Sequence, residues 1–171
     1  EGQAAGGIKF CSVEVAESRF PLFFPRHEFR PDSGGAGRFR GGVGSVLELH
    51  VETTAPGKAN TAGEGVTYPP HGLLGGGDVT THRYRLVSGR RTVVLRTKQV
   101  GIPVMPGDRF LVESSGGGGY GDPRERDPRA IAEDLANGVV TRSGAQPNGA
   151  PSPAAARRDG ADGARRVDVR R

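Results

Sequence analysis

Cysteine and tryptophan are almost absent from this sequence of 171 residues, since Cys11 is the single cysteine and there is no tryptophan. One thiol cannot form a disulfide within the chain, and it cannot assemble a metal site from several thiolates. The composition therefore excludes the small secreted domains that disulfides hold together. It fits a reducing environment, and we expect a cytoplasmic protein.

Long hydrophobic runs are missing as well. No apolar stretch approaches the roughly 20 residues that a membrane-spanning helix needs. The first ten residues, EGQAAGGIKF, lack both the basic start and the apolar stretch of a signal peptide, so we expect no membrane association. The chain begins without methionine, and residues 8–10 have the pattern of a strand already under way. We therefore expect that this piece was separated from upstream sequence.

Aromatic residues make up only 6% of the chain, which has 29 glycines and 13 prolines. Such a composition predicts many turns and a small core. Because each ordered residue costs about 1–2 kcal/mol of conformational entropy, a chain with little apolar surface to bury gains stability by packing against a partner.

The net charge of +5 would ordinarily suggest a nucleic-acid partner. Residues 142–171, however, hold seven arginines against three aspartates, so this tail carries most of the positive charge. The charge distribution therefore argues against nucleic acid as a partner.

Alternating apolar and polar residues predict a mainly β fold. Residues 7–30 contain Pro21 and Pro25, which would interrupt a helix, so we expect extended segments there. Glycine-rich loops are predicted over residues 30–44 and 55–78. The predicted strands, the middle two joined by a hairpin turn, are residues 43–51, 82–87, 91–96 and 109–114.

Residues 128–137 form the one predicted helix. Asp127 is a good N-cap residue, and proline at position 128 suits the first helical position. Ile131 and Leu135 lie four residues apart on one face, and Gly138 is a typical stop signal.

The chain beyond this helix loses its apolar periodicity. Residues 142–171 are low-complexity sequence rich in Ala, Gly, Pro and Arg, and we expect disorder there. Residues 1–141 are expected to form the folded unit. Its predicted architecture is mainly β, a sandwich- or barrel-like mixed sheet with one C-terminal α-helix, glycine-rich loops and a disordered tail.

A run of glycines precedes the helix and has two interpretations. Consecutive amides without side chains can converge on a phosphate, but the run can equally be a tight structural loop, and it lacks the Lys-Ser/Thr ending of a P-loop. Asp122, which precedes a proline, fits a turn or cap better than a catalytic base. The residues of this candidate loop are Gly116, Gly117, Gly118, Gly119, Tyr120, Gly121 and Asp122.

Two arginines, Arg38 and Arg40, stand among glycines in the segment SGGAGRFRGG. A planar guanidinium fork can grip a substrate carboxylate or an acyl phosphate through two hydrogen bonds. Arginine is also favoured at protein interfaces, so a subunit contact is an equal alternative. An RNA-binding Arg-Gly-Gly motif is a distant third interpretation, because the motif occurs only once.

His71 lies between two prolines and a glycine cluster, a setting that can present a side chain to a cleft. It is the weak candidate for a catalytic residue, and a solvated loop histidine is the alternative. None of the four histidines has a metal-ligand spacing such as His-x-x-x-His. We therefore expect no complete metal site in this chain.

Four segments in a fixed order resemble the hydantoinase B/5-oxoprolinase family, which includes N-methylhydantoinase B and the large subunits of acetone and acetophenone carboxylases. They are VEVAESRFPL (13–22), RPDSGGAGRFRGGVGSVLEL (30–49), YPPHGLLGGG (68–77) and PGDRFLVESSGGGGYGDPRERDP (106–128). The resemblance covers about residues 13–141. One glycine run would mean little, but this ordered set is specific.

The resemblance implies ATP-dependent opening of a hydantoin or 5-oxoproline ring, or ATP-dependent carboxylation of a ketone. In such enzymes a hydantoinase A-type partner phosphorylates the carbonyl oxygen, and the subunit resembled here completes the reaction at a metal. The family's metal ligands lie in the N-terminal half of that subunit, which this chain does not contain. ATP and a divalent metal are thus expected in the complete enzyme and neither in this chain. We expect the isolated chain to be inactive, and a non-catalytic assembly module is the alternative.

Overall fold

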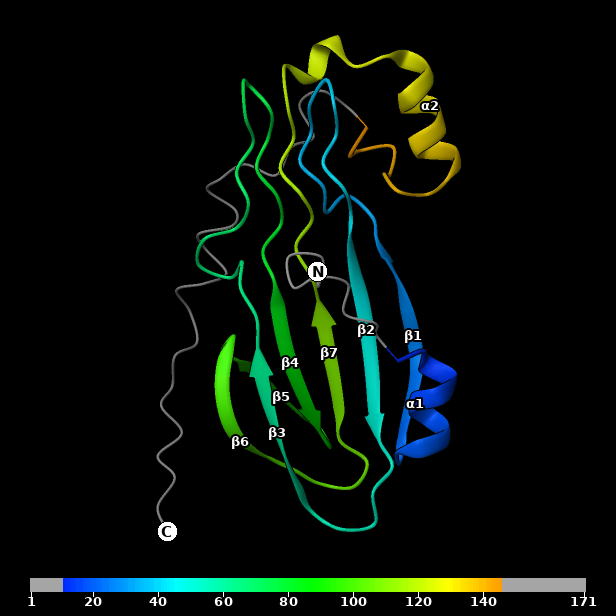
Figure 1. Cartoon of the computed structure of the whole chain (residues 1–171), viewed down its shortest axis with the longest axis vertical. Helices are drawn as coiled ribbons and strands as arrows, with labels where there is room; N and C mark the ends of the chain where they lie inside the picture. Colours follow the sequence, from blue (N-terminus) through cyan, green and yellow to red (C-terminus); the bar gives the residue numbers. More distant parts are fainter. Residues whose placement is uncertain (1–10, 146–171) are drawn as a thin grey trace.

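The strands of this chain form two antiparallel sheets in the computed structural model, which describes residues 11–145 (Figure 1). The larger sheet has the order β1-β2-β7-β4-β5, and the smaller one pairs β3 with β6. The strands are β1 (Leu22–Arg30), β2 (Gly44–Val51), β3 (Gly57–Ala62), β4 (Arg83–Ser88), β5 (Arg91–Leu95), β6 (Lys98–Val104) and β7 (Arg109–Glu113). The helices are α1 (Val13–Arg19), the short 3-10 helix η2 (Pro123–Glu125) and α2 (Pro128–Ala136).

The predicted mainly β architecture is confirmed. The four predicted strands correspond to β2, β4, β5 and β7, with ends that differ by one residue at most. Every ladder between the strands of residues 11–145 is antiparallel. The prediction of a mixed sheet was therefore wrong in this respect. Among the described strands, only β4 and β5 are joined by a tight hairpin, which makes an antiparallel pair by necessity; the other pairs are joined by longer connections.

The core lies between the two sheets. Leu86 of β4, Leu95 of β5 and Ile102 of β6 are buried and form one cluster, against which Phe110 of β7 packs. Leu86 and Phe110 are directly paired across the sheet, and paired residues share a face. The smaller sheet therefore covers the apolar face of the β4, β5 and β7 region, and the result is a small sandwich.

The opposite face of the large sheet carries charged side chains. Arg85 of β4 donates to Glu113 of β7 at 2.9 Å, and Arg30 of β1 lies 3.9 Å from the same carboxylate. The Arg30 guanidinium also donates to the carbonyl oxygens of Thr81 and Ser114. Burial lowers the pKa of Arg30, an effect that the Glu113 carboxylate opposes. Ion pairs thus connect β1, β4 and β7 on this face.

Helix α1 contradicts the prediction of extended structure across residues 7–30. The Ser12 side chain caps the helix by accepting from the Val15 amide, and Glu14 and Arg19 suit its first and last turns. Pro21 follows the helix, so it never occupies a helical position. The part of that prediction before residue 11 lies outside the described residues.

Strand β3 contradicts the prediction of an uninterrupted loop over residues 55–78. Its sequence, GKANTA, has little intrinsic strand preference. The strand forms because β6 supplies its pairing partner, with Gly57 opposite Val104 and Ala62 opposite Lys98. Because its partner strand lies far away in the sequence, β3 carries no local sequence pattern from which it could have been predicted.

The predicted helix is confirmed as α2. The Asp127 carboxylate caps it by accepting from the Arg129 amide at 2.9 Å, and Gly138 follows with φ +67°. The predicted disorder of the tail concerns residues 142–171, of which residues 146–171 lie outside the described chain. No helix within residues 11–145 is long and apolar enough to cross a membrane.

Two residues of β6 provide a matched test of the core. Ile102 is 3% exposed, whereas Val100 on the same strand is 82% exposed. Replacing Ile102 with Ala should lower the free energy of unfolding by about 2–5 kcal/mol, because it leaves a cavity between the sheets. Val100→Ala should change it by no more than about 0.5 kcal/mol. Urea unfolding measures both, and equal effects would contradict the sandwich.

Candidate functional site

Three glycine-rich loops leave the same end of the large sheet. The first loop (residues 31–43) joins β1 to β2, the second (residues 68–78) precedes β4, and the third (residues 114–122) follows β7. Because β1, β2, β7 and β4 are antiparallel neighbours in that order, the ends of these strands that carry the three loops lie at the same end of the sheet. Figure 1 shows the three loops rising side by side above the sheet.

Each loop is hydrogen-bonded to both of the others. Phe39 and Tyr120 exchange two backbone hydrogen bonds of 2.9 Å, which join the first loop to the third. The Leu73 amide donates to the Gly119 carbonyl at 2.9 Å, and the Gly77 amide donates to the Ala36 carbonyl at 2.7 Å. In a flat sheet the two outer segments would not meet. The loops therefore form a triangular arrangement, here called the glycine bundle.

Backbone atoms approach so closely in the glycine bundle that side chains cannot fit between them. A Cβ at Gly41 would overlap the Gly117 carbonyl, and a Cβ at Gly119 would overlap the Ala36 carbonyl. Neither glycine has a positive φ, so close approach and not turn geometry requires them. The same kind of overlap would occur at Gly35, Gly76, Gly116 and Gly118.

Four amides of the third loop, those of Gly117, Gly119, Tyr120 and Gly121, serve this packing. Gly117 donates to the Gly42 carbonyl at 2.8 Å, Gly119 donates to the Gly77 carbonyl at 3.0 Å, and the Gly121 amide donates to the second loop. An amide that already donates to a carbonyl is not available to an anion. The arrangement therefore favours the structural loop among the two interpretations of Gly116, Gly117, Gly118, Gly119, Tyr120 and Gly121.

Asp122 acts as a cap in this structure. Its carboxylate accepts from the Arg124 amide at 2.9 Å and from the Arg124 side chain at 3.0 Å. Hydrogen bonds from the Arg124 side chain and backbone lower the pKa of Asp122 to about 2. The carboxylate is thus held ionised at the start of η2, which suits a cap and not a general base.

The structure separates the two arginines that we predicted as a pair. Arg40 is mostly buried, and its guanidinium makes a two-point contact with Asp134 of α2, with Nε to Oδ2 at 3.1 Å and Nη2 to Oδ1 at 3.2 Å. Arg38 is exposed, 3.8 Å from the Glu125 carboxylate, and lies over the Phe39 ring at 5.6 Å. Only Arg38 presents its guanidinium to solvent.

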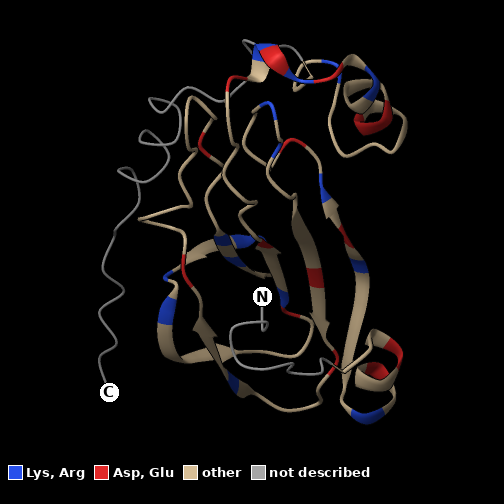
Figure 2. Ribbon diagram, turned by 45° about the horizontal axis from the view of Figure 1, so that its top comes forward, with Lys and Arg blue, Asp and Glu red and all other residues tan. Residues whose placement is uncertain are grey.

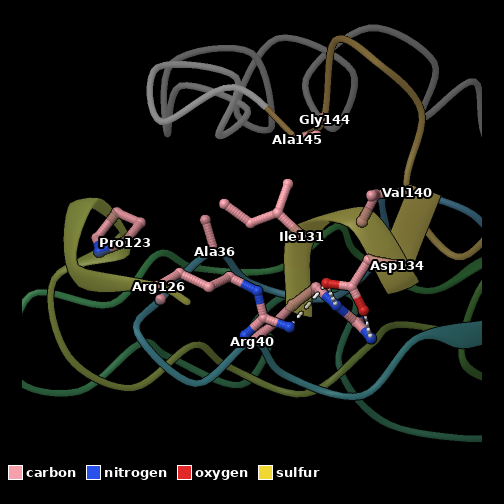
Figure 3. Close-up of a pocket in the computed structure, with 10 residues that line it drawn as sticks. Ala36, Arg40, Pro123, Arg126, Ile131, Asp134, Val140, Gly144 and Ala145 are labelled. Atoms are coloured by element: carbon pink, nitrogen blue, oxygen red, sulfur yellow. Dashed lines mark hydrogen bonds and ion pairs between the residues drawn. The ribbon is translucent and has the colours of Figure 1, made fainter. Parts of the chain in front are cut away.

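Asp134 joins a second arginine to this contact. Arg126 Nη2 donates to Asp134 Oδ2 at 2.7 Å, so two guanidinium groups converge on one carboxylate (Figure 3). Burial raises the pKa of Asp134, but the hydrogen bonds and charges of Arg40 and Arg126 outweigh it, and the pKa lies below its ordinary value. Sequence reasoning missed Asp134 and Arg126. The only local signal is that Asp134 lies one helical turn after Ile131, and both are partly buried, whereas Leu135 is exposed.

A second contact fixes the chain after α2. The Asp32 carboxylate accepts from the Thr141 amide at 2.8 Å and from its hydroxyl at 2.6 Å. Asp32 itself has φ +58°, a left-handed conformation in which Asp is tolerated better than most side chains. Residues that are more than a hundred positions apart thus hold α2 and its following segment against the first loop.

His71 lies on the second loop with its side chain 71% exposed. Its Nδ1 is 3.8 Å from Asp78 Oδ1, an oxygen that also accepts from the Gly72 amide at 3.0 Å. The surroundings match a solvated loop histidine more closely than a catalytic base in a cleft. Within residues 11–145, no three His, Cys, Asp or Glu side chains are grouped so that they could hold a metal ion.

The glycine bundle displays large apolar side chains to solvent. Phe39 of the first loop and Tyr120 of the third lie with ring centroids 6.2 Å apart, and Leu73 of the second loop forms a backbone bridge with Tyr120. Phe39 is 61% exposed, Leu73 62% and Leu74 74%. These four residues, Phe39, Leu73, Leu74 and Tyr120, are here called the apolar patch.

Comparison with known proteins identifies the family. The family model described as hydantoinase B/oxoprolinase matches residues 3–123. This chain belongs to the hydantoinase B/oxoprolinase family. The match includes all three loops of the glycine bundle, and it confirms the resemblance seen in the sequence.

Individual members of the hydantoinase B/oxoprolinase family are similar over most of this chain. The beta subunit of the caprolactamase from Pseudomonas jessenii is 33% identical over 82% of the chain. The B-type subunit of a putative D-/L-hydantoinase from Pseudomonas sp. (strain NS671) is 32% identical over 76% of it. These matches cover 25% and 22% of the two relatives, so the chain spans about a quarter of their length.

A solved structure of the ATP-dependent caprolactamase from Pseudomonas jessenii has the same fold. It matches 78% of this chain and 24% of its own with a TM-score of 0.68 and 32% identity. A nucleotide-free acetone carboxylase matches 80% of the chain with a TM-score of 0.65 and 24% identity, a likeness of fold alone. The fold of most of this chain is therefore found as part of larger chains.

Adjacent glycines of the first loop test the glycine bundle. A Cβ at Gly41 would overlap the Gly117 carbonyl, whereas a Cβ at Gly42 would meet nothing within 4 Å. Gly41→Ala should lower the free energy of unfolding by about 1–3 kcal/mol or more, because backbone must shift. Gly42→Ala should be neutral or should stabilise by up to about 1 kcal/mol. The unfolding temperatures of both variants measure this difference. A Gly41→Ala variant as stable as the unaltered chain would contradict the close packing of the loops.

Arg40→Lys and Arg38→Lys should differ in stability. Arg40→Lys loses the two-point contact with Asp134 and should destabilise, whereas Arg38→Lys should have little effect because Arg38 is exposed. Because the pKa of Asp134 is lowered in the folded state, its ion pair stabilises above its ordinary pKa of 3.8 and is lost as the pH falls through the lowered value. The Arg40→Lys defect should therefore shrink in acid. A defect that persists at low pH would contradict this assignment.

Proposed function

We propose that this chain is the C-terminal portion of the hydantoinase B-type subunit of an ATP-dependent cyclic-amide hydrolase, of the kind that opens hydantoin or 5-oxoproline rings. The observation that carries the proposal is the family match over residues 3–123, which include the whole glycine bundle, together with relatives named for this chemistry. The 5-oxoprolinase of Saccharomyces cerevisiae, at 30% identity, adds to them.

A second candidate is the corresponding part of an ATP-dependent ketone carboxylase. The delta subunit of acetophenone carboxylase from Aromatoleum aromaticum matches 85% of the chain, a larger share than the amide hydrolases match. Its identity is 28%, below the 33% of the caprolactamase relative. Identity therefore favours a cyclic amide as the substrate.

The contribution of this chain to such an enzyme is structural support and contact. Its described residues do not fit a divalent metal, since none of their His, Cys, Asp and Glu side chains are suitably grouped. The third loop uses four of its amides for packing and lacks the lysine of a P-loop. We therefore assign the steps at ATP and metal to other parts of the complete enzyme, including a hydantoinase A-type subunit.

The apolar patch is the proposed contact with those other parts. Its members come from all three loops, and the bundle fixes their positions relative to one another. Exposed clusters of aromatic and aliphatic side chains with an adjacent arginine are typical of interface centres. Arg38 occupies that position beside Phe39. A rigid bundle that carries such a patch lowers the entropy cost of association.

Co-expression tests both parts of the proposal. The chain is produced with the remaining part of a hydantoinase B-type subunit and a hydantoinase A-type subunit, and the purified assembly is given ATP. Coupled ATP consumption and ring opening of hydantoin, 5-oxoproline or caprolactam is the expected result. ATP-dependent carboxylation of a ketone without ring opening would establish the second candidate. An assembly that forms and catalyses neither reaction would leave only a non-catalytic assembly role.

Charge insertion tests the apolar patch. Phe39→Asp with Leu73→Asp should weaken co-purification of the other subunits at least about tenfold, because each charge must be desolvated at the contact. The matched control is Val94→Asp with Val100→Asp, two sites that are 76% and 82% exposed and lie on the sandwich. The control pair should assemble normally. Equal assembly by both variants would contradict the patch as a contact.

A further inference from the structure

The pocket between the glycine bundle and α2 holds an excess of positive charge. Arg40 and Arg126 share the single carboxylate of Asp134, and the three side chains are 18%, 16% and 13% exposed. Two guanidinium groups and one carboxylate leave one positive charge that no residue among 11–145 lining the pocket compensates. Charge that is removed from water is costly unless an opposite charge or several hydrogen bonds compensate it.

The arginines also retain unused donors. Arg126 Nε is buried and has no hydrogen-bond partner among the described residues. The other Arg126 nitrogens donate to the Arg38 carbonyl at 3.3 Å and to Asp134 at 2.7 Å. One Arg40 nitrogen donates to the Gly41 carbonyl, and two donate to the Asp134 carboxylate. A guanidinium has five N–H groups, so both arginines can donate further.

The same arginines line a small cavity. Its volume is about 50 Å³, and its walls include Ala36, Ile131 and Val140. Figure 3 shows Arg126 and Arg40 below Ala36 and Ile131, with both guanidinium groups directed to Asp134. The size is far below the roughly 300–1,000 Å³ of a typical substrate pocket. The apolar part of the wall lowers the local dielectric constant, which strengthens a charged contact made inside.

We propose that this pocket binds a carboxylate through the guanidinium groups of Arg126 and Arg40, which both line it. A carboxylate carries one negative charge, which equals the uncompensated charge of the pocket. A phosphate carries more negative charge than the pocket leaves uncompensated. Asp122 is bonded to Arg124, and the Asp32 carboxylate is bonded to Thr141, so neither supplies the missing anion.

Acetate is the probe for the site. The full chain, labelled with ¹⁵N in arginine, is titrated with sodium acetate at an ionic strength held constant with sodium chloride. The expected result is a saturable shift of one buried arginine Nε–H resonance, together with a higher unfolding temperature in acetate than in chloride. No saturable shift, or an equal response to chloride alone, would overturn the proposal.

Lysine substitutions identify the residue that responds. Arg126→Lys keeps the positive charge near Asp134 but removes the guanidinium group that lines the cavity, so the acetate response should disappear. Arg124→Lys changes an arginine two positions earlier that is 78% exposed, and it should respond like the unaltered chain. Figure 2 shows that basic and acidic residues alternate along this η2–α2 region. Comparing the Arg126→Lys and Arg124→Lys variants therefore separates a specific effect of Arg126 from the general charge of the region. An acetate response retained in Arg126→Lys would overturn the assignment. If Arg126→Lys does not fold, the titration of the unaltered chain still decides.

The natural carboxylate can be a free acid or an acidic side chain from another part of the enzyme. In the co-expressed assembly, a free acid as ligand predicts that acetate still shifts the resonance. An acidic side chain predicts that assembly shifts it and that acetate no longer does. Either outcome requires the shift in the isolated chain, and therefore neither depends on the proposed function.

Discussion

The close approach of three backbones in the glycine bundle is the constraint on which the rest of this structure depends. At positions such as Gly41 and Gly119 a neighbouring carbonyl occupies the space of a Cβ. Glycine loses more conformational entropy on folding than any other residue. Hydrogen bonds between the three loops, whose backbone groups would otherwise be exposed to water, offset this loss. The four strands below the bundle hold the loop ends in register, so neither part is independent of the other.

The charged contacts around α2 depend on that bundle. Arg40 lies on the first loop, and its fork reaches Asp134 only because the loop is held beside the third one. Asp32, at the start of the same loop, binds Thr141 after the helix. These contacts place α2 along the bundle without burying a single residue of the helix fully. Polar contacts at defined positions thus perform the docking that an apolar helix face performs in most small domains.

Local sequence patterns were sufficient for the elements whose signals are local. Alternation predicted β2, β4, β5 and β7, and capping residues predicted α2. Strand β3 was missed because its pairing with β6 is a tertiary effect, and α1 was missed because two later prolines outweighed its own cap. The partner of Arg40 lies 94 positions away, beyond any motif. Glycine runs show that a loop is present, but they have no periodicity that would predict which loops touch. The resemblance to known enzymes supplied the family and not these contacts.

Amide hydrogen exchange is the most direct test of the glycine bundle as a packed unit. In a bundle, the amides of Gly117, Gly119 and Gly121 each donate to a carbonyl of another loop, so they should exchange as slowly as those of β7. An open loop that waits for an anion would exchange these amides at the rate of an unstructured glycine peptide. Slow exchange at all three positions is the predicted result. Rapid exchange in the otherwise folded chain would show that the loops are separate and that the glycines serve another purpose.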